Sequence, residues 1–117
     1  MVGLHSVVGI LVIAVNAAAA AVGLYFLWRK RSPRRGYLHL LAFAQTSVIA
    51  QAAIGLLMLS GGSRSVDRLH YVYGAVALAA ILSPWLYAPP APARRLLWFT
   101  GAALAAAALS VRAYLTG

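Results

Sequence analysis

The sequence lacks cysteine entirely and holds a single acidic residue, Asp67, among its 117 residues. The absence of cysteine excludes structural disulfides, thiolate-bound zinc, covalently attached c-type haem and dithiol redox chemistry. The absence of any carboxylate within an apolar stretch excludes carboxylate-bridged metal pairs and hydrolysis by paired carboxylates. It also argues against a small proton-coupled exporter, which needs a carboxylate inside the membrane. With no Ser/His/Asp or Walker-like motif either, the sequence favours a non-enzymatic role.

Hydrophobic residues, by contrast, are abundant: they make up 63% of the chain, charged residues make up 9%, and the mean hydropathy is +0.85. A soluble domain does not tolerate this composition on its surface. Four apolar runs, at about 4–28, 37–60, 69–88 and 96–115, each approach the roughly 20 residues that cross a bilayer core. Because irregular backbone cannot face lipid, they predict helices. We therefore expect one domain, 1–117, folded as an all-α, integral membrane four-helix bundle.

The positive charges are concentrated between these runs, and the net charge is +9. Five of them fall in the first connection, which is Arg29-Lys30-Arg31-Ser32-Pro33-Arg34-Arg35-Gly36. Short basic loops stay in the cytoplasm, so this pattern predicts an N-out/C-out protein of a bacterial-type cell membrane. Alternation of the spans then leaves three cations outside: Arg64, Arg68 and Arg112. Anionic lipid head groups of the bilayer explain the basic balance better than nucleic acid does.

A short pattern of histidine and glycine stands at the start of two of the apolar runs. It occurs as Leu69-His70-Tyr71-Val72-Tyr73-Gly74 and, 65 residues earlier, as Leu4-His5-Ser6-Val7-Val8-Gly9. Either duplication of a two-helix hairpin or chance among similar apolar helices would produce the match. Before the later copy, Ser65 is a candidate N-cap with Asp67 in the first turn of the helix. The predicted topology puts both histidines on the outer side of the membrane.

Two imidazoles from different helices suit the axial positions of one b-type haem, so His5 and His70 are candidate ligands of a haem iron. Gly9 and Gly74 follow their histidines by four residues on the same helix face and would leave room for the porphyrin. The propionates would then point outward, toward cations that can pair with them. The candidate propionate partners are Arg64, Arg68 and Arg112, and the candidate hydrogen-bond donors are Tyr71 and Tyr73.

Other interpretations of the same residues stay open. Histidines near span ends also occur simply as interfacial residues, and a metal ion or a quinone would also suit such a site. Small residues at 17–21 and at Gly101, Ala105 and Ala108 would let another helix approach closely, as in a homo-oligomer or an assembly subunit of a larger, respiratory-type membrane complex. The remaining polar residues of the spans, His39, Asn16, Gln45 and Gln51, have no assigned role beyond hydrogen bonding.

The His-Tyr-x-Tyr-Gly motif at 70–74, together with Arg112-Ala113-Tyr114-Leu115-Thr116-Gly117, resembles small uncharacterised bacterial four-span membrane proteins. That resemblance covers the whole chain and implies no particular activity. More loosely, a bundle with paired histidines is similar to the cytochrome b561 class, whose members hold two haems between two histidine pairs. This chain has three histidines, so the similarity implies at most one such site.

Overall fold

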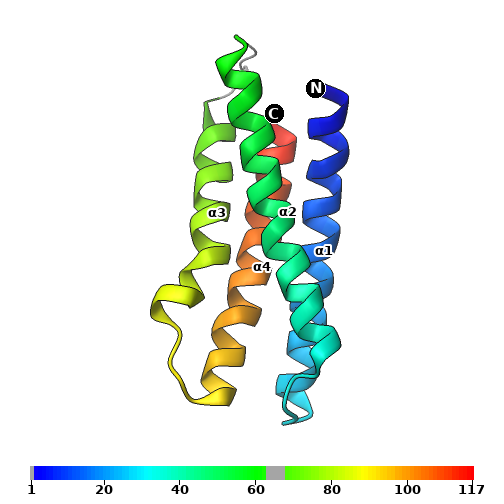
Figure 1. Cartoon of the computed structure of the whole chain (residues 1–117), viewed down its shortest axis with the longest axis vertical. Helices are drawn as coiled ribbons and strands as arrows, with labels where there is room; N and C mark the ends of the chain where they lie inside the picture. The colour runs from blue at the N-terminus through cyan, green and yellow to red at the C-terminus, as the bar shows by residue number, and fades with distance from the viewer. Residues whose placement is uncertain (1, 63–67) are drawn as a thin grey trace.

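The computed structural model describes residues 2–62 and 68–117, in which the regular secondary structure is helix and no strand occurs. It contains four helices, α1 Val2–Trp28, α2 Arg35–Ser60, α3 Leu69–Tyr87 and α4 Pro92–Thr116 (Figure 1). All four are long and apolar enough to cross a membrane. At about 1.5 Å per residue even the shortest approaches the thickness of a bilayer core of about 30 Å. The prediction of an all-α, multi-pass membrane bundle is confirmed.

The helices form a ring in which α4 packs closely against both α1 and α3, and α1 packs against α2. Contact between α2 and α3 is the slightest of the neighbouring pairs, and α1 and α3 lie diagonally opposite each other. Both chain ends lie at one end of the bundle (Figure 1). We call this the histidine end, because it holds His5 and His70. The opposite end carries the connections α1–α2 and α3–α4 with their arginines, and we call it the basic end.

The helix boundaries differ from the predicted runs mainly at the start of α4. Helix α4 begins at Pro92, so Arg94 and Arg95 lie in its first turn and not in the connection, where the sequence pattern had put them. The reason is that proline suits the first turn of a helix, where its missing N–H costs no hydrogen bond. Helix α3 begins at Leu69, which places His70 in its first turn. The candidate cap Ser65, with Asp67, lies outside the described residues.

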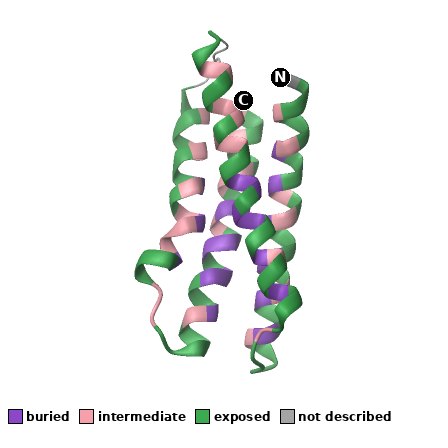
Figure 2. Cartoon of the chain, viewed as in Figure 1, coloured by how far each residue is buried: buried purple, intermediate pink, exposed green. Residues whose placement is uncertain are grey.

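The buried residues lie on the inward-facing sides of the helices (Figure 2). Many of them are small, whereas large apolar residues are exposed on the outside. The main core cluster contains five alanines, of which Ala19, Ala44, Ala103 and Ala106 are fully buried, with Ile81 from α3. Leu86 and Leu115, by contrast, are 79% and 70% exposed. Lipid tails are as apolar as leucine, so membrane helices gain from close approach of their backbones more than from burying large side chains. This distribution is the one expected of a bundle solvated by lipid.

Helix α1 ends with a residue in an unusual backbone conformation. Lys30 has a φ of 53°, and the amides of Lys30 and Arg31 donate hydrogen bonds back to the carbonyls of Leu27 and Phe26. This pair of bonds defines a Schellman cap, which normally carries glycine at the left-handed position. The cap turns the chain sharply into the basic connection and so fixes where α2 starts.

Candidate functional site

The two histidines of the repeated motif meet at the histidine end of the bundle. The His5 and His70 ring centroids lie 5.9 Å apart, with the ring planes at 73°. Both side chains are partly buried, and they come from the diagonally opposite helices α1 and α3. The sequence motif thus corresponds to one place in the fold, where two imidazoles face a common space. The third histidine, His39, is exposed near the start of α2 at the basic end.

The His70 ring is held by the end of α4. Its Nδ1 lies 2.6 Å from the carbonyl oxygen of Ala113. Because a carbonyl can only accept, Nδ1 carries the proton in this contact and Nε2 keeps its lone pair. Gly117 packs on the same ring, since a Cβ there would lie 2.8 Å from Cε1 and 2.9 Å from Nδ1. A carbonyl bound to one ring nitrogen is the usual way in which proteins orient the other toward a metal.

His5 contacts the C-terminal half of α2. Gln51 Nε2 donates to the His5 backbone carbonyl at 2.9 Å, and a Cβ on Gly55 would lie 3.4 Å from His5 Cε1. His5 Nδ1 and Gln51 Oε1 are both buried without a hydrogen-bond partner in the described part of the chain. Unpaired buried polar atoms are uncommon and costly, so they mark the space beside His5 as one in which a polar group would be stabilised.

The two glycines of the motif have different surroundings. A Cβ on Gly74 would meet nothing within 4 Å, so α3 is open beside His70. Gly9 is buried, and a Cβ there would lie 3.1 Å from Gln51 Nε2 and 3.4 Å from Tyr114 Cδ2. The surroundings of Gly74 on α3 are therefore open, whereas side chains of α2 and α4 pack against Gly9 on α1.

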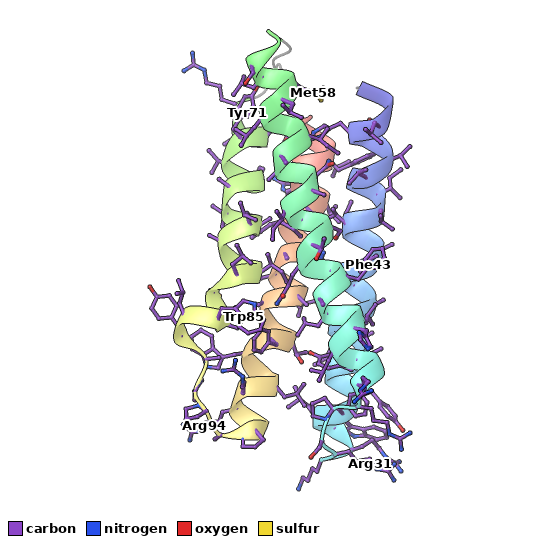
Figure 3. The ribbon with its side chains drawn as sticks, in the orientation of Figure 1. Arg31, Phe43, Met58, Tyr71, Trp85 and Arg94 are labelled. Carbon is purple, nitrogen blue, oxygen red and sulfur yellow. The ribbon has the colours of Figure 1, made fainter. Side chains whose placement is uncertain are left out.

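The candidate cations and tyrosines stand around the rim of the site. Arg112 lies 5.5 Å from the centre of the Tyr73 ring, and its guanidinium approaches the Tyr73 hydroxyl at 3.5 Å. The Tyr71 ring lies 5.7 Å from the His70 ring and is visible at the histidine end in Figure 3. Arg68, just before α3, is exposed. Arg64 lies outside the described residues.

Several residues of the site were not selected from the sequence: Gly55, Ala113, Tyr114 and Gly117. Gln51 was recognised only as a polar residue within a span. Its position four residues before Gly55 on one face of α2 was the available signal. The Ala113 carbonyl had none, because a backbone acceptor is not encoded by residue type.

More polar residues lie deeper in the bundle and contribute no further ligand set. Asn16 is fully buried, and its Nδ2 donates to the Val12 carbonyl of its own helix at 2.8 Å, while Oδ1 is unpartnered. Gln45 and Thr100 are also buried with one unpartnered atom each. No cluster of three or more histidine, cysteine or acidic side chains occurs within residues 2–62 and 68–117. The chemistry available at the site is that of two imidazoles with an amide and cations nearby.

Comparisons with known proteins add no functional information about this site. No family model matches the chain, and neither the curated proteins nor the solved structures contain a match to it. The resemblance to small four-span proteins and the looser one to the cytochrome b561 class stay predictions.

Proposed function

We propose that this protein binds one b-type haem at its histidine end through His5 and His70, and serves one-electron transfer or haem handling at that membrane surface. The observation that carries the proposal is the pair of imidazoles 5.9 Å apart on diagonal helices. Two imidazoles that meet from different helices could supply both protein ligands of one b-type haem.

The surrounding residues support the same assignment. The Ala113 carbonyl holds His70 in the tautomer that leaves Nε2 available. The open side of Gly74 would admit the edge of a porphyrin. Arg68 and Arg112 would pair with the propionates, which requires Arg112 to leave the Tyr73 hydroxyl or to share it. A bound haem supplies one-electron redox chemistry, and the protein supplies ligands, orientation and a low-polarity environment.

The test is optical spectroscopy of the protein purified from cells supplied with a haem precursor. We expect a Soret band and sharp α and β bands on reduction, with haem content near one per chain. His5→Ala and His70→Ala should each lose the six-coordinate low-spin spectrum. The matched control is His39→Ala, which removes an exposed histidine at the basic end and should leave the spectrum unchanged. A protein that stays colourless after expression with ample haem and after titration with hemin overturns the proposal.

The orientation of the bundle belongs to the same proposal. Seven of the cations described lie at the basic end: Arg29, Lys30, Arg31, Arg34, Arg35, Arg94 and Arg95. The positive-inside rule favours this end in the cytoplasm of a bacterial-type cell, with both chain ends and the histidine pair outside. The proposed haem would then exchange electrons or haem with partners outside the cytoplasm.

A second candidate function, as an assembly subunit of a larger membrane complex or as a homo-oligomer, is supported by the outer surface of α1 and α4. A shallow apolar groove runs between them, lined by alanines that include Ala17, Ala21 and Ala108. Such surfaces admit a neighbouring helix at close range. A colourless protein that elutes in mild detergent with one stoichiometric membrane partner would favour this function over haem binding.

A further inference from the structure

A second groove runs along the outside of the bundle, between α3 and α4. It has a volume of about 470 Å³ and is lined by Ala80 and Ser83 of α3 and by Leu97, Trp98, Gly101 and Ala105 of α4. A Cβ on Gly101 would meet nothing within 4 Å, so the floor of the groove is open.

Helix α3 is bent just beyond the groove. Pro84 lies inside α3 and cannot donate the hydrogen bond that the Ala80 carbonyl would normally accept, and the Ser83 hydroxyl donates to that carbonyl at 2.8 Å instead. A proline within a helix bends it, and serine hydroxyls commonly satisfy the released carbonyl in membrane helices. Beyond this point α3 turns away from the bundle (Figure 1). The groove itself lies beside the part of α3 that precedes the bend, at Ala80 and Ser83, opposite the small residues Gly101 and Ala105 of α4.

Two arginines, Arg94 and Arg95, lie in the first turn of α4, between the groove residues of this helix and the basic end of the bundle. Arg94 precedes Leu97, Trp98 and Gly101 by three, four and seven residues, so it continues the groove face of α4 into the first turn of the helix. Figure 3 shows it below the α3–α4 connection. The Arg95 guanidinium lies 5.9 Å from the centre of the Trp85 ring and 5.2 Å from that of Phe99. Neither arginine faces an acidic side chain among the described residues, since the only acidic residue of the chain is Asp67.

We propose that this groove binds an anionic phospholipid, with an acyl chain along Gly101 and Ala105 and with its phosphate on Arg94 and Arg95. An apolar groove with Arg94 at the head of the same helix face, and with Arg95 beside it and without an acidic partner, matches the two halves of such a lipid. Guanidinium groups bind phosphate strongly, so Arg95 would contact the phosphate from its place beside the Trp85 and Phe99 rings. A second copy of the chain is a poorer occupant. In a parallel pair it would bring four arginines together without an acidic side chain to neutralise them. The inference does not depend on haem binding.

The experiment is native mass spectrometry of the detergent-purified protein with phosphatidylglycerol and with phosphatidylcholine of the same acyl chains. We expect phosphatidylglycerol to be retained at least about tenfold more strongly, because each basic residue near a head group adds to the attraction. Arg94→Gln/Arg95→Gln should abolish this preference. Gly101→Leu, which fills the groove, should weaken the binding of both lipids. Glycerol phosphate, the soluble head group, should not bind detectably, because it lacks the acyl chain.

Two matched control variants distinguish lipid binding at this groove from a general attraction of anionic lipids to a basic protein. Arg31→Gln/Arg34→Gln removes the same charge from the other connection, and Ala21→Leu fills the groove between α1 and α4. Both should retain the wild-type preference for phosphatidylglycerol. The proposal is overturned if Arg31→Gln/Arg34→Gln loses the preference for phosphatidylglycerol as fully as Arg94→Gln/Arg95→Gln does. It is also overturned if Arg94→Gln/Arg95→Gln binds the lipids as the wild type does. Conversion of a dimer to a monomer by Gly101→Leu without a change in lipid binding would overturn it in favour of a second copy. Thermal unfolding of each variant verifies that it is folded.

Discussion

The contact between Gly23 of α1 and Thr100 of α4 allows a quantitative test of how these helices pack. Both residues are buried, and Thr100 is 2% exposed. A Cβ added to Gly23 would fall directly on the Thr100 hydroxyl oxygen and 3.1 Å from both Cβ and Cγ2 of Thr100. Rotation of χ1 gives little relief, because two of the three staggered positions on a β-branched side chain carry a heavy atom and the Thr100 Cβ does not move. We therefore expect α1 and α4 to be pushed apart in Gly23→Ala.

The size of the effect follows from a comparison with Gly101→Ala. Both substitutions replace glycine within a helix and should gain the same helix propensity, about 0.8–1.0 kcal/mol. Gly101→Ala adds its methyl group to open space, whereas Gly23→Ala overpacks a core contact, which typically costs about 1–3 kcal/mol. The free energy of unfolding of Gly23→Ala should therefore lie about 1–3 kcal/mol below that of Gly101→Ala.

The assay is reversible unfolding of the purified variants in mixed micelles with increasing SDS, followed by circular dichroism. Thr100→Ala in the Gly23→Ala background removes Oγ1 and Cγ2 and should restore part of the lost stability, which a double-mutant cycle measures as a coupling between the two sites. Equal stability of Gly23→Ala and Gly101→Ala would refute the reasoning. It would show that α1 and α4 do not approach each other closely at this level.

Three further predictions concern orientation, the core and the end of α1. Because the chain has no cysteine, a single introduced cysteine reports on which side of the membrane it lies. Ser32→Cys should resist a membrane-impermeant maleimide added to intact cells, whereas Thr116→Cys should react. The reverse labelling would show that the proposed orientation is inverted. Asn16→Leu should raise the midpoint of SDS unfolding, because it replaces a buried, unpartnered amide oxygen whose burial costs about 1–3 kcal/mol. A lower midpoint would mean that this oxygen is paired in the membrane. Lys30→Gly should stabilise the protein by about 1–2 kcal/mol in the same assay, since a left-handed conformation costs about that much for a residue with a Cβ, and no gain would contradict the positive φ.

Much of the fold could be predicted from the sequence because a bilayer constrains it so strongly. The lengths of the apolar runs set the helices, and the predicted bounds differ from the observed ones by no more than a few residues. The largest difference is at the start of α4, which begins at Pro92 although the predicted run began at 96. In the first turn of a helix proline is an initiator.

The candidate site was only partly predictable. The repeated motif pointed to His5 and His70, but nothing in residue type indicated that the Ala113 carbonyl would hold one ring or that Tyr114 would fill the space beside Gly9. Backbone acceptors and the neighbours of a glycine depend on how helices pack. The groove between α3 and α4 was unpredictable for the same reason, because it depends on how Ala80 and Ser83 of one helix face Gly101 and Ala105 of the other.

The sequence by itself determined that this chain is a membrane protein with helical spans and with one strongly basic end, because hydrophobic length and charge distribution act locally along the chain. It also determined which residue types were available for chemistry: imidazoles and guanidiniums, but no thiol and a single carboxylate outside the apolar runs. Only the tertiary structure decided that the two histidines meet, because their spacing depends on the diagonal arrangement of α1 and α3. Contacts between helices in lipid depend on the fit of small surfaces to one another, and that fit is a property of the folded bundle.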